Sequence, residues 1–150
     1  MPRVDLLGPK ITLPEDWHGI SAVFVAPRAK ATSTVPSEAG TVGFQDTVAV
    51  SIEPVPSGTT PRAYLDAQIE AMRASGQTVE LIETQPTEGS VASITCELTA
   101  TGPRGRQIGQ VQFVAIKNGM AWIVLGNAPR DHGWAEAKER LQKIIETFEF

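Results

Sequence analysis

The sequence predicts an α+β fold, in which a mostly antiparallel sheet of about six or seven strands has helices packed on its faces. Three observations support this prediction. Short alternating apolar runs, typical of strands, fill much of residues 47–55 and 78–125; two segments carry apolar residues at helical spacing; and Asn118-Gly119 separates two apolar runs as a hairpin turn does. With 150 residues, 41% of them hydrophobic, the chain is expected to form a single domain, residues 1–150.

The first part of the chain predicts short strands and one long loop. The runs KITLP and ISAVFVAP each end at a proline, which cannot donate a backbone hydrogen bond and tends to close a strand. The segment from Arg28 to Gly43 is small, polar and aperiodic, so we expect a long mobile loop there. A strand is expected next, from Thr47 to Val55.

Two helices are predicted from their caps and apolar stripes. The first is expected from Pro61 to Ser75, because Thr60 can cap its first amides and Gly76 can end it. The second is expected from His132 to Glu146, with Asp131 as its cap. The apolar stripes are Leu65, Ile69 and Met72 in the first helix, and Trp134, Ala137, Leu141, Ile144 and Phe148 in and just after the second.

The remaining strands lie between Thr78 and Leu125. TVELIETQPT is the least regular of them, whereas SVASITCELTA alternates well. Its apolar face holds Ala92, Ile94, Cys96, Leu98 and Ala100, and its polar face holds Ser93, Thr95, Glu97 and Thr99. We expect the core to include Leu65, Ile69, Ile94, Leu98, Phe113, Trp122, Trp134 and Leu141.

The expected hairpin has one unusual face. If Asn118-Gly119 is a two-residue turn, Lys117 pairs with Met120 and the register of both strands is fixed. One face is then uniformly apolar and is expected to be core. The opposite face is apolar near the turn but carries Gln110 and Gln112 farther away.

Two interpretations of this face remain open. A buried amide without a partner costs roughly 1–3 kcal/mol, so the glutamines need hydrogen bonds from somewhere. They could bond Thr95, Glu97 or Thr99 of the preceding strand, or water. Alternatively, the face is a groove that docks a hydrophobic helix of a partner protein. The groove hypothesis assigns partner binding to Gln110, Gln112, Val114, Ile116, Ile123 and Leu125.

No motif in the sequence predicts catalysis. His18 and His132 have no second His or Cys at ligand spacing, so we expect neither a metal site nor catalytic residues. Cys96 lies on an apolar strand face, where a packing role is expected. The glycines form no phosphate-binding or dinucleotide-binding fingerprint, so no cofactor is expected. The candidate carboxylates, which lack a recognisable companion base, are Glu80, Glu83, Glu88 and Glu97.

Charge and the N-terminal sequence predict a cytoplasmic protein that binds no nucleic acid. The net charge is −4, and the 13 basic residues are scattered among 17 acidic ones. A single cysteine gives no sign of an oxidising compartment. The first residues contain neither a secretory h-region nor a lipoprotein anchor, and no run is long enough for stable insertion into a membrane.

The order of several short patterns resembles the PsbP/DcrB-like superfamily. These patterns are LPEDW, FQDTVAVSIEPVPSGTTPRAYLDAQIEAM, GQVQFVAIKNGMAWIVLG and the closing ETFEF, and the resemblance extends from Ile11 to Phe150. It implies a small α/β/α sandwich without enzymatic activity. Members of the superfamily include photosystem-associated subunits, lipoproteins, a Ran-binding import factor and Eag-type chaperones, which shield the transmembrane helices of type VI secretion effectors.

The resemblance and the amide-bearing strand face together favour a non-enzymatic adaptor or chaperone. Its expected partner is a protein with hydrophobic or transmembrane helices, such as a type VI secretion effector. The alternative is a PsbP-like or lipoprotein-like assembly factor or small-ligand binder. A homodimer is compatible with either function.

Overall fold

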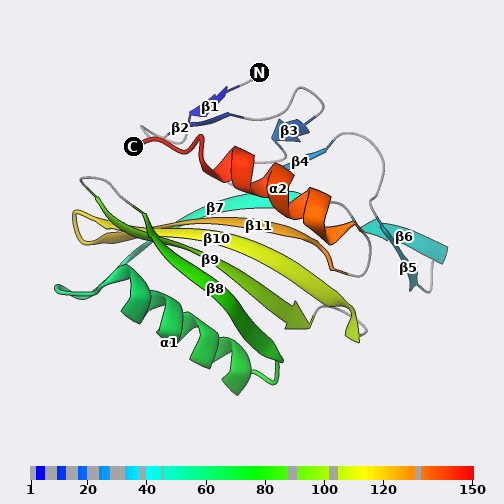
Figure 1. Ribbon diagram of the computed structural model, residues 1–150, viewed down its shortest axis with the longest axis horizontal. Coiled ribbons are helices and arrows are strands. Elements are labelled where there is room, and N and C mark those ends of the chain that lie inside the picture. The colour runs from blue at the N-terminus through cyan, green and yellow to red at the C-terminus, as the bar shows by residue number, and fades with distance from the viewer. Residues whose placement is uncertain are drawn as a thin grey trace.

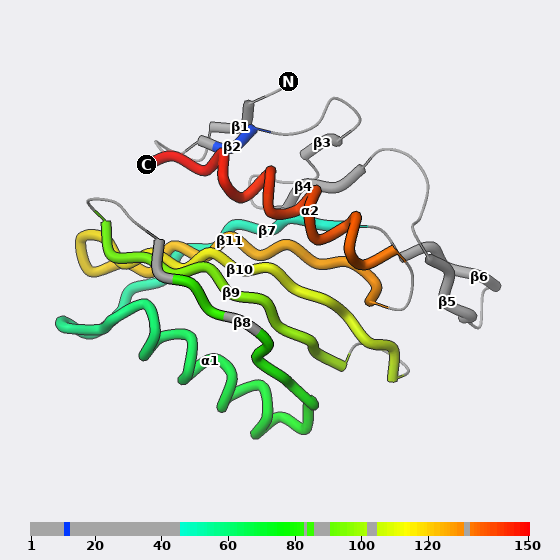
Figure 2. Tube along the Cα trace, in the orientation of Figure 1, coloured from blue at the N-terminus to red at the C-terminus, as the bar shows by residue number. Residues whose placement is uncertain are grey.

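The computed structural model describes most of the chain from Asp46 onward (Figure 2) and the backbone of isolated strands before it. The described backbone comprises residues 3–5, 10–12, 17–19, 24–27, 33–37, 40–44, 46–87, 91–101, 105–130 and 133–150. Side chains are described for residues 11–12, 46–82, 84–85, 91–101, 105–130 and 133–150.

A seven-stranded antiparallel sheet separates two helices, α1 on one face and α2 on the other (Figure 1). The strand order is β3-β4-β7-β11-β10-β9-β8, and two further pairs, β1-β2 and β5-β6, stand apart from it. This arrangement confirms the predicted α+β fold. The elements are β1 (Arg3–Asp5), β2 (Lys10–Thr12), β3 (Trp17–Gly19), β4 (Phe24–Pro27), β5 (Ser33–Ser37), β6 (Gly40–Phe44), β7 (Thr47–Pro54), α1 (Pro61–Ala74), β8 (Val79–Thr87), β9 (Ala92–Thr101), β10 (Gln107–Lys117), β11 (Met120–Pro129) and α2 (Trp134–Ile145).

The structure differs from the sequence prediction mainly in the first part of the chain and at the start of α2. The segment expected to be a loop contains the paired strands β5 and β6, with Pro36 inside β5. Helix α2 begins at Trp134, and Gly133, which has a φ of 66°, stands at its cap in place of the expected Asp131. Asp131 itself lies outside the described residues. The strands β1 and β3 were not predicted, because each has only three residues and no measurable alternation.

The start of α1 follows from its sequence as expected. The Thr60 side chain accepts a hydrogen bond from the Ala63 backbone N–H at 3.1 Å, and Pro61 occupies the first turn. This cap satisfies one of the amides that a helix start leaves unpaired. At the other end, Gly76 has a φ of 90°, a conformation that glycine adopts without steric cost.

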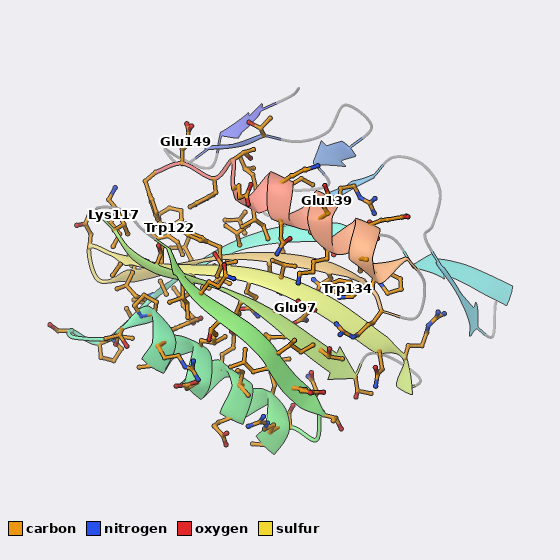
Figure 3. The ribbon with its side chains drawn as sticks, in the orientation of Figure 1. Glu97, Lys117, Trp122, Trp134, Glu139 and Glu149 are labelled. Atoms are coloured by element: carbon orange, nitrogen blue, oxygen red, sulfur yellow. The ribbon has the colours of Figure 1, made fainter. Side chains whose placement is uncertain are left out.

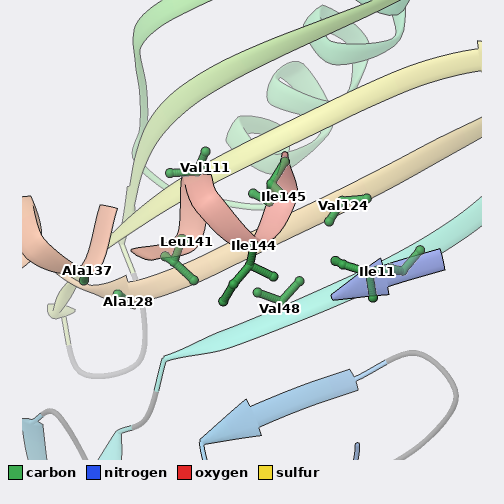
Figure 4. Close-up of a cluster of buried hydrophobic side chains, with 10 residues drawn as sticks. Ile11, Val48, Val111, Val124, Ala128, Ala137, Leu141, Ile144 and Ile145 are labelled. Carbon is green, nitrogen blue, oxygen red and sulfur yellow. The ribbon is translucent and has the colours of Figure 1, made fainter. Parts of the chain in front are cut away.

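Each face of the sheet has its own hydrophobic core. The α2 side (Figure 4) contains Ile11, Val48, Val50, Val111, Val124, Ala128, Ala137, Leu141, Ile144 and Ile145. The α1 side contains Leu65, Ile69, Val79, Cys96, Leu98 and Ala100. Close approach of α2 requires glycine in the sheet, because a Cβ atom at Gly109 would overlap the Trp134 ring.

Four of the eight predicted core residues are buried, and the other four are only partly buried. Leu65, Leu98 and Leu141 are fully buried and Ile69 nearly so. The remaining four predicted core residues, Ile94, Phe113, Trp122 and Trp134, are only partly buried. Phe113 and Trp122 lie at the hairpin end of the sheet, where Phe148 packs on both rings with centroid distances of 5.7 and 6.3 Å.

Candidate functional site

The β10–β11 hairpin has the predicted turn and register. Asn118 and Gly119 have positive φ angles of 52° and 72°, as a two-residue hairpin loop requires. Lys117 pairs with Met120, so Gln112 lies opposite Leu125 and Gln110 opposite Asn127. The six predicted partner-binding residues therefore share one face of β10 and β11, and we call this set the amide face.

Helix α1 covers part of the amide face. It packs over β8, β9 and β10 (Figure 1). On the neighbouring strand β9, Leu98 lies beside Gln110 and Cys96 beside Gln112. The two glutamines are thus embedded in an otherwise apolar sheet face beneath a helix.

The six residues of the amide face differ in their access to solvent. Gln112 is 1% exposed, Val114 is fully buried and Ile123 is 4% exposed. Gln110, Ile116 and Leu125 are partly exposed. The structure brings all six together, but only the second group could touch a partner without a movement of the protein.

The hydrogen bonds suggested from Gln110 and Gln112 to Thr95, Glu97 or Thr99 are absent, so that part of the prediction was wrong, whereas hydrogen bonds to water stay a prediction. Glu97 lies opposite Val111 in the β9–β10 ladder, so Glu97 points to the α2 side together with Thr95 and Thr99. Within the described residues, the amide oxygens of Gln110, Gln112 and Gln68 are buried and accept no hydrogen bond. Gln68 belongs to the inward side of α1, and the sequence alone gave it no role.

One flank of α1 borders a more open part of the same sheet face. The Tyr64 hydroxyl donates to Glu53 Oε1 on β7, and Gln68 follows one helical turn later on the same side. Beyond this flank, Ser51 and Glu53 are exposed, and Leu125 is partly exposed. The sheet face that carries the amide face therefore continues from β10, which α1 covers, to a more exposed region on β11 and β7.

On the opposite face, Glu97 is the centre of a buried polar cluster (Figure 3). Arg130 Nη1 and Trp134 Nε1 each donate to Glu97 Oε1 at 3.1 Å, and Lys138 Nζ donates to Oε2. Arg130 also stacks on the Trp134 ring, with its guanidinium carbon 5.4 Å from the ring centre. The cluster ties α2 and the end of β11 to β9.

The electrostatics of Glu97 favour its charged form. Desolvation by burial raises its pKa, but the hydrogen bonds from Lys138, Arg130 and Trp134 and the positive charge of Lys138 outweigh this effect. The result is a pKa below the ordinary value of 4.5. Sequence reasoning placed Glu97 on a polar strand face and missed these three partners, which lie 33 to 41 residues later in the chain.

Cys96 lies on the α1 side and has the environment of a packing residue. Its side chain is 3% exposed among the apolar residues beneath α1. Burial raises the pKa of the Cys96 thiol to about 12, so the thiol stays protonated near neutral pH.

A second polar feature flanks α2. Asp46 is 1% exposed and accepts a hydrogen bond from Arg140 through Oδ2, whereas its Oδ1 has no partner within the described residues. Next to this pair is a hollow of about 360 Å³. Its described lining residues are Thr12, Glu136, Glu139, Arg140, Lys143, Ile144 and Thr147.

The described residues contain few other candidates for chemistry. In this part of the chain, no group of three His, Cys, Asp or Glu side chains is arranged to hold a metal ion. Neither described helix is long and apolar enough to cross a membrane. His132, Glu88 and the side chains of His18 and Glu83 lie outside the described residues, and Glu80 is exposed.

Two solved structures have a similar fold. The solution structure of cyanobacterial PsbP (CyanoP) from Synechocystis sp. PCC 6803 aligns with a TM-score of 0.61 at 16% identity, covering 95% of this chain and 86% of that protein. A crystal structure of PA94 from Pseudomonas aeruginosa, a protein of unknown function described as a putative regulator, gives a TM-score of 0.61 at 12% identity, covering 92% and 88%. No family model and no curated protein matches the chain. The chain therefore has a PsbP/DcrB-like fold, as its short sequence patterns predict.

Proposed function

We propose that the protein is a non-enzymatic binding module that docks an apolar helix of a partner protein on the amide face. The observation that carries this proposal is the set of buried amide oxygens on Gln68, Gln110 and Gln112, which accept no hydrogen bond within the described residues. Such atoms are rare in folded proteins, because each loses the hydrogen bonds that water would give it. A partner that donates hydrogen bonds at this place would remove that cost.

The surroundings of the amides indicate the chemistry of the partner. The partly exposed residues of the amide face combine the apolar side chains of Leu125 and Ile116 with the side chain of Gln110, whose amide oxygen is buried. Helices that associate through small residues also carry Ser and Thr hydroxyl groups, which donate hydrogen bonds across the contact. An apolar helix with such hydroxyl groups fits both properties of the surface.

The same proposal includes a cytoplasmic location and a relationship to the Eag-type chaperones. A type VI secretion effector with transmembrane helices would present the required surface before its export. Catalysis is not part of the proposal, because the Cys96 thiol is protonated and the Glu97 carboxylate is held by three donors.

Binding can be tested with two fluorescent helical peptides of about 20 apolar residues, the length of a membrane-spanning helix. One peptide carries Ser or Thr at every fourth position and the other carries Ala there. We expect the hydroxyl-bearing peptide to bind more tightly in fluorescence anisotropy titrations. Gln110→Ala should weaken its binding about threefold to tenfold, because one interhelical hydrogen bond contributes about that much.

Gln107→Ala is the matched control, because Gln107 is an exposed glutamine of the same strand that points to the other face. It should bind both peptides as the wild-type protein does. The proposal fails if neither peptide binds the wild-type protein saturably, or if the two substitutions have the same effect.

The hollow beside α2 supports the alternative, a small-ligand-binding or assembly factor. Its volume of about 360 Å³ suits a small molecule, and Arg140 and Lys143 provide positive charge within its lining. The PsbP-like fold fits this alternative equally well. A small acidic ligand that raises the melting temperature and shifts the NMR signals of Ile144 and Thr147, without changing those of Gln110 and Leu125, would favour the alternative.

A further inference from the structure

The amide face is only half accessible in the folded protein, and α1 is the helix that lies over it. Gln112 is 1% exposed and Val114 is fully buried, so neither side chain can meet a partner while α1 stays in place. The buried amide oxygens belong to both sides of this contact, with Gln68 on the helix and Gln110 and Gln112 on the sheet. Docking at these residues therefore requires α1 to move.

The bonds that hold α1 to the sheet lie at its periphery. Within the described residues, Arg62 Nη1 donates to Thr84 Oγ1 at 3.3 Å, and Arg73 Nη2 donates to the Val79 carbonyl at 3.1 Å. The Arg62–Thr84 and Tyr64–Glu53 bonds are exposed, and the Arg73–Val79 bond is partly buried. Exposed bonds of this kind are readily exchanged for bonds to water, so they resist opening weakly.

Both connections of α1 contain a glycine with positive φ. Gly58, in the segment before the helix, has a φ of 84°, and Gly76, just after it, has a φ of 90°. An added Cβ atom would meet nothing within 4 Å at either position, so both turns lie in open space. Glycine turns at the two ends of a segment can absorb the backbone rotation of a hinge.

We infer that α1 is a lid over the amide face, which rotates as a unit about Gly58 and Gly76 and exposes Gln112 and Val114 to the partner helix. This inference rests on the proposed function and adds its regulation. The unsatisfied amides raise the free energy of the closed state and thereby favour opening. The apolar contacts of Leu65 and Ile69 close the lid again when no partner is bound.

Native-state hydrogen exchange tests the lid directly. In the wild-type protein, α1 amides should exchange through an opening that leaves α2 protected. Gln112→Met replaces the amide with an apolar side chain of similar shape, so α1 protection should rise about tenfold, as expected when a buried unsatisfied group is removed. Gln107→Met, at the exposed position of the same strand, should leave α1 protection unchanged.

Gln68→Met gives a second variant if Gln112→Met does not fold, because it removes an unsatisfied amide from the helix itself. Its α1 protection should also rise. Equal exchange of α1 and α2 through global unfolding would overturn the inference. So would lower α1 protection in Gln112→Met or Gln68→Met, because it would mean that water satisfies these amides in the closed protein.

The lid and the proposed function can fail separately. Saturating hydroxyl-bearing peptide should increase exchange in α1 if the lid opens for its partner. Peptide binding without such an increase would overturn the lid and leave the binding module intact. Opening of α1 in a protein that binds neither peptide would support the lid and refute the proposed partner.

Discussion

The two helices pack on opposite faces of one sheet, but they satisfy the polar groups beneath them differently. Under α2, the buried carboxylate of Glu97 receives three hydrogen bonds. Under α1, the buried amides of Gln110 and Gln112 receive none from the described residues. The α2 side also contains two buried oxygens without a partner within the described residues, Asp46 Oδ1 and Thr99 Oγ1, so the contrast is between Glu97 and the glutamines. Glu97 ties α2 to the sheet, whereas the amides under α1 retain unused hydrogen-bonding capacity.

The largest loss of stability is expected when the hydrogen-bonded cluster around Glu97 is removed. Glu97→Ala removes the acceptor of three donors and leaves Arg130 and Lys138 without their buried partner, so the free energy of unfolding should fall by about 3 kcal/mol. Urea denaturation followed by circular dichroism measures this change. Glu139→Ala is the control on the same helix: its pair with Lys143 is fully exposed, and no measurable change is expected. An equal response of both variants would show that Glu97 does not anchor α2.

A somewhat smaller loss of stability is expected when a substitution disturbs the close approach of α2 to the sheet. Gly109→Ala places a Cβ atom where the Trp134 ring lies, and the displaced ring also donates to Glu97. Overpacking of this kind should cost about 2 kcal/mol in urea denaturation. Gly126→Ala should cost less, because its Cβ atom would lie 3.1 Å from the Leu141 side chain, whereas a Cβ atom at Gly109 would lie 2.3 Å from the Trp134 ring. A change below about 0.5 kcal/mol at Gly109 would contradict the tight α2 packing.

Low pH should reduce the stability that the Glu97 cluster contributes. The folded-state pKa of Glu97 is below its ordinary value of 4.5, so the unfolded chain binds the proton more readily. The stabilisation from Glu97 is therefore complete above about pH 4.5 and is lost as the pH falls through the lower folded-state pKa. Thermal unfolding between pH 7 and pH 3 should show a steeper loss for the wild-type protein than for Glu97→Gln. Parallel curves would mean that Glu97 does not titrate as a bonded carboxylate.

The features that could be predicted from the sequence are set by residues close together in the chain. The hairpin register was predictable because Asn118-Gly119 allows one tight turn, and that turn determines every pair between β10 and β11. The amide face follows from this register alone. The start of α1 was predictable because Thr60 and Pro61 act locally.

The features that were missed depend on contacts between distant segments. The register of β9 against β10 is not encoded in the link TGPRGR, and a shift of one residue reverses every side chain, so Thr95 and Glu97 were wrongly considered as partners for the glutamines. The burial of Glu97 depends on donors from β11 and α2. Gln68 was given no role, because a helical period does not reveal which sheet residues lie beneath a helix.

The central claim is that the amides under α1 are unsatisfied in the resting protein and available to a partner. Equilibrium urea denaturation of Gln112→Met tests it most directly, with Gln107→Met as the control. The account predicts that Gln112→Met raises the free energy of unfolding by about 1 kcal/mol, because a buried unpaired amide is replaced by an apolar group of similar shape. A decrease of that size would contradict the account, because it would mean that the Gln112 amide already has its hydrogen bonds in the folded protein.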